Sequence, residues 1–386
     1  MTATFEEIVE SVDNNRASVR ELFEGDSRLG GRGHDPRRLA EAITLYDNVL
    51  KGRKPMYYLQ EAMTRSDFPL LFADILDRQL LGSYQETTPT WAAYAKRGVV
   101  NDFRTVKRFA VDGAEGPLDP VEEMEEYKEG ELSEDADTYS VRKYGRKLGL
   151  SWEALINDDL DALRDLPSRL ARGARRTESR FATSLFVDEN GPHASLYNGG
   201  FGNIVPGNPA LSIEGLQEAF ITLSRMVDED NEPIVLDVVT LVVPPALEVT
   251  AMNILNALQI EASSMGGSSD QVLIAQNWMK NKVNLAVEPY IPHVASTDNG
   301  DTSWWLFPQP SVGRPALEVG FLRGYEEPAL YEKVPDARRV GGGEVLESFD
   351  NDSRQWRVRH VFGGTRLVNT GGYRVTVASN GSEEAS

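Results

Sequence analysis

The chain has 386 residues, of which 40% are hydrophobic and 26% are charged, a composition typical of a folded protein and not of a disordered one. It has no cysteine and no apolar run of about 20 residues, which excludes disulfides, thiolate metal sites and a membrane-spanning helix. Acidic residues (60) outnumber basic ones (40), so the net charge of −20 argues against a protein whose whole surface attracts DNA phosphates.

The first 85 residues are predicted to be largely helical. Residues 1–34 are polar and acidic, which favours a weak helix followed by a flexible, glycine-rich stretch. A firm helix is expected between Pro36, which suits the first helical turn, and Gly52, which follows the end. A second helix is expected from Ser66 to Leu81. The inward positions of the helix that begins at Pro36 are Leu39, Ile43, Tyr46 and Leu50.

A strongly acidic segment follows a strand-like stretch. Between Asp112 and Asp137 there are twelve Asp or Glu residues and one lysine, Lys128. Like charges repel one another, so we expect this segment to project into solvent or onto a partner. The sign then reverses at Arg142, Lys143, Arg146 and Lys147. A solvated loop beside a solvated strand is the alternative interpretation.

A strand over residues 138–152 and a long helical region are expected next. Apolar residues recur there in steps of three, four and seven, which indicates a helix with one buried face. Pro167 lacks a backbone donor, so we expect a short helix that ends near Leu166 and a longer one from Ser168 to Asp188. The apolar positions are Ile156, Leu160, Leu163, Leu170, Ala174, Phe181 and Leu185, and the arginines of the region are Arg164, Arg169, Arg172, Arg175, Arg176 and Arg180.

Residues 211–325 are predicted to form an α+β or α/β subdomain. Ser212 is expected to cap a helix, residues 234–243 to form a buried strand, and Pro245 to open another helix. Residues 263–270 are predicted to form a mobile loop, and residues 299–301 are predicted to form a turn. The inward positions are Leu216, Phe220, Leu223 and Val227 in the first helix and Leu247, Ala251, Ile254 and Leu258 in the second.

The C-terminal part is predicted to return to strands. Trp356, Val358 and Phe362 alternate with arginines, as expected for a strand with one buried face. A second alternation, of Tyr373, Val375 and Val377, follows a turn at Gly371 and Gly372, and residues 381–386 are expected to be loose.

Motifs for catalysis are not found. The four histidines include no pair at helical spacing, and neither a phosphate-binding loop nor a nucleophile elbow is present. We therefore expect a protein that is not an enzyme and that has no cofactor, catalytic residue or metal site. The histidines are His34, His193, His293 and His360.

Four segments carry a resemblance to a known family. They are residues 144–147 (YGRK), 151–160 (SWEALINDDL), 241–248 (LVVPPALE) and 320–328 (GFLRGYEEP). In this order, and with the arginine-rich helix, they resemble the major capsid proteins of tailed bacteriophages over roughly residues 85–378. The sequence is most similar to the major head subunit family of Mu-like phages and prophages.

The resemblance implies the Hong Kong 97-type capsid fold, an α+β fold with an N-terminal arm, an extended hairpin, a long spine helix and an axial domain. The implied parts are the arm in 1–85, the acidic hairpin and its flanking strands in 86–150, the peripheral domain with the spine helix in 151–210, the axial domain in 211–325, and strands that complete the peripheral domain in 326–386.

The resemblance also implies a virion protein that is assembled in the host cytoplasm. Its copies would form pentamers and hexamers of an icosahedral shell that encloses double-stranded DNA without sequence-specific binding, together with a portal and with scaffold or decoration proteins, and without a membrane. The residues expected at subunit contacts are Glu122, Glu123, Glu125, Glu126, Lys128, Arg142, Lys143, Arg146, Lys147, Arg172, Arg175 and Arg176. The arginines of the long helix could instead face DNA.

Several alternatives stay open at this point. Some capsids of this fold join subunits by a Lys–Asn isopeptide bond, for which Lys128 and either Asn351 or Asn369 would be the partners. The chain could also form a cargo-enclosing nanocompartment of the same fold, another virion part such as a tail or decoration protein, or a soluble acidic enzyme with an unrecognised carboxylate site.

Overall fold

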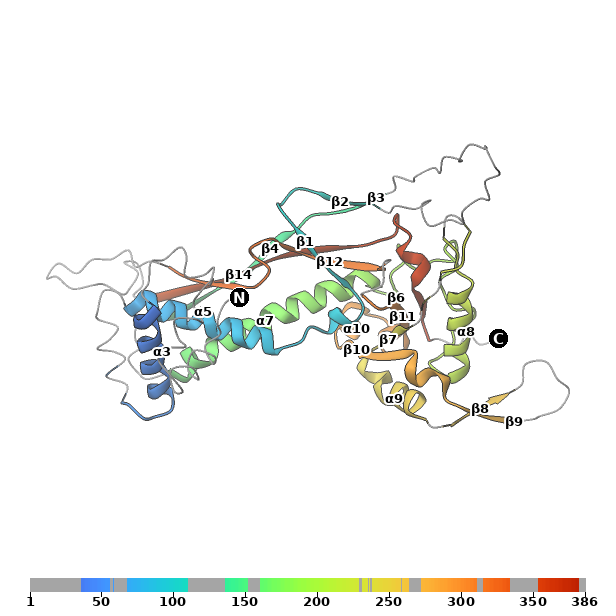
Figure 1. Cartoon of the computed structure of the whole chain (residues 1–386), viewed down its shortest axis with the longest axis horizontal. Helices are drawn as coiled ribbons and strands as arrows, with labels where there is room; N and C mark the ends of the chain where they lie inside the picture. The colour runs from blue at the N-terminus through green and yellow to red at the C-terminus, as the bar shows by residue number, and fades with distance from the viewer. Residues whose placement is uncertain are drawn as a thin grey trace, which may run out of the picture. The chain divides into compact units, whose positions relative to one another are not determined.

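A computed structural model describes residues 36–55, 58, 68–109, 136–151, 160–228, 231–234, 236, 238–257, 259–263, 272–310, 315–333 and 353–381. Helices accompany mixed, mainly antiparallel sheets there, which confirms the α+β class (Figure 1). The chain divides into two compact units that are both discontinuous in sequence. The first unit takes in residues 1–88, 143–177 and 324–361, and the second takes in residues 89–142, 178–323 and 362–386.

Two helices of the first unit come from the N-terminal part of the chain. Helix α3 (Pro36–Leu50) begins and ends where the sequence predicts, and it packs against α5 (Phe68–Glu86). The expected end of the second helix at Gly82 is wrong, because α5 continues for one more turn. A glycine inside a helix costs only about 1 kcal/mol, and the buried residues Leu80, Leu81 and Tyr84 around Gly82 stabilise the helix enough to offset that cost.

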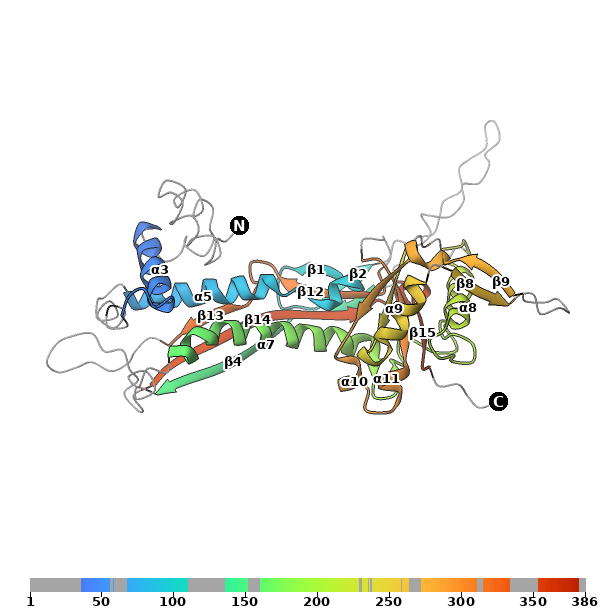
Figure 2. The ribbon, with the colours of Figure 1, turned by 90° about the horizontal axis from the view of Figure 1, so that it is seen from below.

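The sheet of the first unit is built on β14 (Ser353–Arg366), which pairs with both β4 (Arg142–Ser151) and β13 (Ala329–Glu332) (Figure 2). Helix α5 lies against β13, where the Leu330 amide donates a hydrogen bond of 2.8 Å to Asp77 Oδ1. The strand expected over 138–152 is therefore two strands, because β3 (Ala136–Tyr139) ends before β4 begins.

The long helix α7 (Leu160–Phe186) is continuous through Pro167. The expected break at this proline is wrong: proline removes one backbone hydrogen bond, but the residues on either side keep helical geometry. The buried face follows the expected spacing, with Leu170, Ala174 and Leu185 all inside. The helix ends at Phe186 because the next residues form β5 (Val187–Asp188), which pairs with β6 (Gly191–Pro192).

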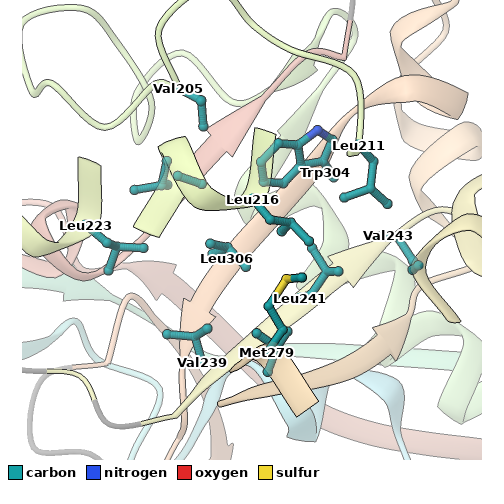
Figure 3. Close-up of a cluster of buried hydrophobic side chains, with 14 of the residues drawn as sticks. Val205, Leu211, Leu216, Leu223, Val239, Leu241, Val243, Met279, Trp304 and Leu306 are labelled. Carbon is teal, nitrogen blue, oxygen red and sulfur yellow. The ribbon is translucent and has the colours of Figure 1, made fainter. Parts of the chain in front are cut away.

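The core of the second unit is a four-stranded sheet in the order β10-β7-β11-β15. Strand β7 (Val239–Val243) is buried along its whole length, and its side chains pack with those of helix α8 (Ile213–Ser224) and with Trp304, Leu306 and Met279 (Figure 3). The strands around β7 are β10 (Val283–Val287), β11 (Trp304–Pro308) and β15 (Val377–Ser379).

The second unit also contains two-stranded ribbons and two strands that pair with each other, one of which also pairs with β14. Strand β1 (Lys96–Val100) runs parallel to β12 (Leu317–Leu322), which pairs with the second half of β14. Ribbons are formed by β2 (Val106–Phe109) with β3, and by β8 (Gln259–Ser263) with β9 (Val272–Gln276). The short helices are η1 (Thr90–Ala93), α10 (Ile291–Val294), η3 (Trp278–Asn281) and α11 (Asn299–Thr302).

The helix and strand between residues 211 and 243 differ from expectation at their ends. Ser212 caps α8 as expected, since its Oγ accepts from the Gly215 amide at 2.9 Å. Val227 is exposed, because the helix ends three residues before it. The strand expected to begin at Ile234 begins at Val239, because the Ile234 amide donates to the Met226 carbonyl in a turn.

Later elements differ from expectation in their type. The helix expected at Pro245 starts as one turn of 3-10 helix, η2 (Pro245–Leu247), and continues as α9 (Glu248–Asn256). The expected turn at residues 299–301 lies within helix α11. The strand expected from Tyr373 is a 3-10 turn, η4 (Gly372–Val375), because Gly371 has a φ of 77° and redirects the chain before β15. Residues 1–34 and 264–270 lie outside the described residues.

Candidate functional site

A groove of about 350 Å³ lies along strands β4 and β14 in the first unit. Five of its eight lining residues are basic. Lys143, Arg146 and Lys147 come from β4, and Arg357 and Arg359 come from β14. We call these five residues and the space between them the basic groove.

Strand pairing brings the two sets of basic residues together. A Cβ atom on Gly145 would lie 2.7 Å from the Val358 carbonyl oxygen, so the absence of a side chain allows β4 to approach β14 closely. Val358 is buried, and because side chains alternate along a strand, its neighbours Arg357 and Arg359 lie on the opposite, outer face.

Tyr331 on β13 supports both arginines of β14. Its ring centroid lies 5.2 Å from the Arg357 guanidinium carbon and 4.6 Å from that of Arg359, and Arg359 also donates a hydrogen bond to the Tyr331 hydroxyl. Each exposed cation–π contact stabilises by about 0.5–1 kcal/mol. The aromatic ring therefore orders two positive charges on the outer face of the sheet.

The charge of the basic groove has no carboxylate partner in the part of the chain that the structure describes. Among the residues that the structure describes, none of its five basic side chains forms an ion pair. The chain as a whole has a net charge of −20, so the basic groove is a local exception to its acidic composition. Its chemistry fits an anionic ligand that is extended enough to contact several cations at once.

The structure places the expected contact residues in different settings. Lys143, Arg146 and Lys147 meet in the basic groove, whereas Arg142 is exposed and does not line it. On α7, Arg172 and Arg176 are exposed. Five of the expected contact residues lie outside the described residues, namely Glu122, Glu123, Glu125, Glu126 and Lys128.

Arg175 is bound inside its own unit. Its guanidinium lies over the Tyr84 ring, and its Nε donates to the Tyr84 carbonyl oxygen at 3.0 Å. The subunit contact expected for Arg175 stays a prediction, and this side chain already has a structural role within the chain.

Sequence reasoning missed the contribution of Arg357 and Arg359. Their alternation with Trp356 and Val358 is visible in the sequence, and it correctly indicates a strand. That alternation predicts only that the two arginines share a face; it does not indicate that β4 is the neighbouring strand.

The second unit contains a fully buried carboxylate, Glu288. Its Oε2 accepts hydrogen bonds from the hydroxyls of Thr90 and Tyr94, the latter at 3.1 Å, and its Oε1 accepts from the Tyr290 amide at 3.3 Å. Burial raises the pKa of Glu288, although these hydrogen bonds oppose the shift. With its oxygens occupied by protein donors, Glu288 serves as a polar contact of the core.

Asn369, one of the two asparagines considered for an isopeptide bond, is hydrogen-bonded within its own chain. Its side-chain amide donates to the Ala136 carbonyl at 3.3 Å, and its backbone amide donates to Asp137 Oδ1 at 3.1 Å. The other residues considered, Lys128 and Asn351, lie outside the described residues. The cross-link therefore stays a prediction.

Two kinds of feature are absent from the residues that the structure describes. No group of three or more side chains that could hold a metal ion occurs among them. None of the helices in this part of the chain combines the length and the apolar character that a membrane span requires.

Comparison with known proteins gives one family match. A family model described as "Phage capsid protein" matches residues 134–375, more than half of the chain. No match is found among curated proteins.

Several solved structures are similar to this chain. An encapsulin complex from Synechococcus elongatus is 12% identical, with a TM-score of 0.45, over 78% of this chain and 90% of that one. The capsid of Ralstonia phage GP4 is 10% identical, with a TM-score of 0.44, over 77% and 89%. A virus-like particle from Pyrococcus furiosus is 11% identical, with a TM-score of 0.41, over 80% and 99%.

Proposed function

Because the chain belongs to the phage capsid protein family, we propose that it is the major capsid protein of a tailed double-stranded-DNA phage or prophage and that its copies assemble into an icosahedral shell around the genome. The family match over residues 134–375 is the observation that carries this proposal. A member of this family is a structural protein of the virion capsid and not an enzyme. The Hong Kong 97-type fold forms part of the proposal, and α7 is its spine helix.

The shell is stabilised by repetition of modest contacts. A subunit in a closed symmetric assembly makes each type of contact with several neighbours, so individually weak interfaces add up to a stable container. Copies arranged as pentamers and hexamers would close such a shell. A portal, and scaffold or decoration proteins, would be its additional partners, and the enclosed DNA needs no sequence-specific contact.

The basic groove is a subunit contact in this proposal, and its occupant is the acidic segment of another copy. Eleven carboxylates lie from Asp112 to Asp135 in the sequence, whereas the groove carries five cations without a described carboxylate partner. Charges of opposite sign on repeated copies steer subunits towards each other and fix their register. The acidic residues expected in this contact are Glu122, Glu123, Glu125 and Glu126, with Lys128 among them.

The exposed cations outside the groove are secondary contacts. Arg142, Arg172 and Arg176 project into solvent in the single chain, and each exposed ion pair that they form with a neighbour would contribute only about 0–1 kcal/mol. Arg175 would take part only by giving up its contact with Tyr84.

The parts of the capsid subunit are assigned as the sequence suggests: the arm in 1–85, the hairpin in 86–150, the peripheral domain in 151–210 and 326–386, and the axial domain in 211–325. Within the family, the four motif segments favour kinship with the head subunits of Mu-like phages.

The experiment is to express the full-length chain, purify it and view it by negative-stain microscopy, followed by analysis of the particle contents. Closed shells of uniform size are expected. Shells that form during phage or prophage induction and contain DNA would support the capsid role, whereas shells filled with a protein cargo would indicate a nanocompartment. A chain that stays monomeric at every concentration, with or without partner proteins, would overturn the proposal.

A further inference from the structure

The ribbon formed by β2 and β3 has two unlike faces. Directly opposed residues of antiparallel strands share a face, and the register pairs Val106 with Tyr139 and Arg108 with Asp137. These four residues are buried or half-buried. The other face holds Lys107, Phe109 and Thr138, which are exposed, with 60% of Phe109 accessible. The inner face of the ribbon is therefore mostly polar and the outer face covers nothing in the described chain.

The inner face makes its first contact with Glu318 on β12. Arg108 Nη2 lies 2.6 Å from Glu318 Oε1, and the Tyr139 hydroxyl donates to the same oxygen at 2.5 Å. Burial lowers the pKa of the Arg108 guanidinium, but the hydrogen bond and charge of Glu318 outweigh this effect, so the pKa of Arg108 is raised overall. Glu318 therefore holds one side chain from each strand of the ribbon.

Two glycines leave room for this cluster. A Cβ atom on Gly98 would overlap the carboxylate of Glu318, and a Cβ atom on Gly320 would overlap the Tyr139 ring and hydroxyl. Gly98 and Gly320 face each other in the parallel pairing of β1 and β12. The absence of these two side chains thus leaves the space that the Glu318 carboxylate and the Tyr139 ring occupy.

The second contact lies at Asp137, which is buried. Its Oδ1 accepts from the Asn369 amide at 3.1 Å, and its Oδ2 accepts from the amide and hydroxyl of Thr370 at 3.0 and 2.8 Å. Asp137 on β3 is directly opposite Arg108 on β2. The two contacts therefore fix both strands of the ribbon at the same position of their pairing register.

We propose that Arg108, Tyr139 and Asp137 are positioning residues for assembly: they fix the orientation of the ribbon of β2 and β3, whose two strands flank the acidic residues 110–135 in the sequence, and so set how this ribbon meets another copy. This inference rests on the proposed function. A two-stranded ribbon is at best marginally stable by itself, so these polar contacts decide where it lies. Ion pairs and hydrogen bonds are directional, whereas apolar burial is not, and a polar inner face therefore sets the orientation of the ribbon.

The test compares two full-length double variants with the wild type. Arg108→Gln with Asp137→Asn removes both contacts, whereas Lys107→Gln with Thr138→Ala changes the opposite face of the same two strands. The readouts are the overall unfolding midpoint, amide hydrogen exchange of residues 106–109 and 136–139, and the yield of closed shells by sedimentation and microscopy.

The inner-face variant is expected to exchange faster in the ribbon, to keep the exchange protection of β7, and to yield roughly tenfold fewer shells, which corresponds to a loss of about 1.4 kcal/mol for the two contacts together. Arg108→Lys, which keeps the charge, should restore part of the yield. If the double variant does not fold, Tyr139→Phe, which lacks only the hydroxyl, provides the same comparison on a smaller scale.

If the wild type forms shells and the inner-face variant forms them in the same yield, the positioning role is overturned and the proposed function is left intact. Equal losses in the inner-face and outer-face variants would also overturn it. A wild-type chain that never forms shells would overturn the proposed function itself, and with it the positioning role of the ribbon in assembly.

Discussion

The guanidinium of Arg175 lies 3.4 Å from the centroid of the Tyr84 ring, and its Nε donates to the carbonyl oxygen of the same residue. This contact joins the first-unit part of α7 to α5. Arg175 is one of six arginines on this helix. Its contact with Tyr84 distinguishes it from Arg172 and Arg176, which are exposed.

Arg175→Ala is expected to lower the free energy of unfolding by about 1–3 kcal/mol, the sum of a partly desolvated cation–π contact and one hydrogen bond. Urea unfolding of the unassembled chain measures this difference. Arg172→Ala is the matched control and should change stability by no more than about 0.5 kcal/mol. Equal effects of the two substitutions would contradict the structural role of Arg175.

Gly145→Ala is expected to destabilise the chain by about 1–3 kcal/mol, because the new methyl group would press against the backbone of β14. Gly173→Ala is the control, since Gly173 lies in α7 with no atom near its absent Cβ. That change should stabilise the chain by about 0.5–1 kcal/mol. Thermal unfolding of both variants checks the pair, and a stabilising effect at Gly145 would contradict the close approach of the two strands.

Reversal of charge in the basic groove is expected to reduce assembly without unfolding the chain. Lys147→Glu with Arg357→Glu removes two groove cations, while Lys280→Glu with Lys282→Glu makes the same change in net charge at exposed positions elsewhere. Light scattering should show slower shell formation for the first variant alone.

In the wild type, assembly should weaken as salt rises, because salt screens exposed charges. Assembly that is indifferent to both changes would exclude the groove as a contact.

Glu288→Gln is expected to alter how stability depends on pH. Burial raises the pKa of Glu288 above 4.5, so the folded chain holds this proton more tightly than the unfolded chain. The contribution of this proton to the free energy of unfolding is fully present below pH 4.5 and is lost as pH rises through the folded-state pKa. Between the unfolded-state and folded-state pKa values, the loss is about 1.4 kcal/mol for each pH unit. The variant has no charge to form there. Its stability relative to the wild type should therefore increase with pH over this range.

Urea unfolding at a series of pH values measures this effect. Glu189→Gln, at an exposed position, is the control and should follow the wild-type pH dependence. A constant difference between wild type and Glu288→Gln at all pH values would contradict burial as the origin of the raised pKa.

Features that depend on neighbouring residues in the sequence could be predicted. Pro36 and Gly52 bracket α3, and Ser212 caps α8, because capping and helical periodicity act within a few residues. The prediction failed at Gly82 and Pro167, where low helix propensity indicated the end of a helix. Gly and Pro cost about 1 and 3 kcal/mol inside a helix, and the packing of the whole helix outweighed this cost.

The sequence by itself determined the α+β class, the positions of most helices, the acidic segment and the resemblance to phage capsid proteins, since each depends on composition, periodicity or order along the chain. Only the tertiary structure decided which charges meet: Arg357 and Arg359 beside Lys143 and Lys147, and Arg108 beside Glu318. These groups come from distant parts of the sequence, and strand pairing, which no local pattern encodes, brings them together.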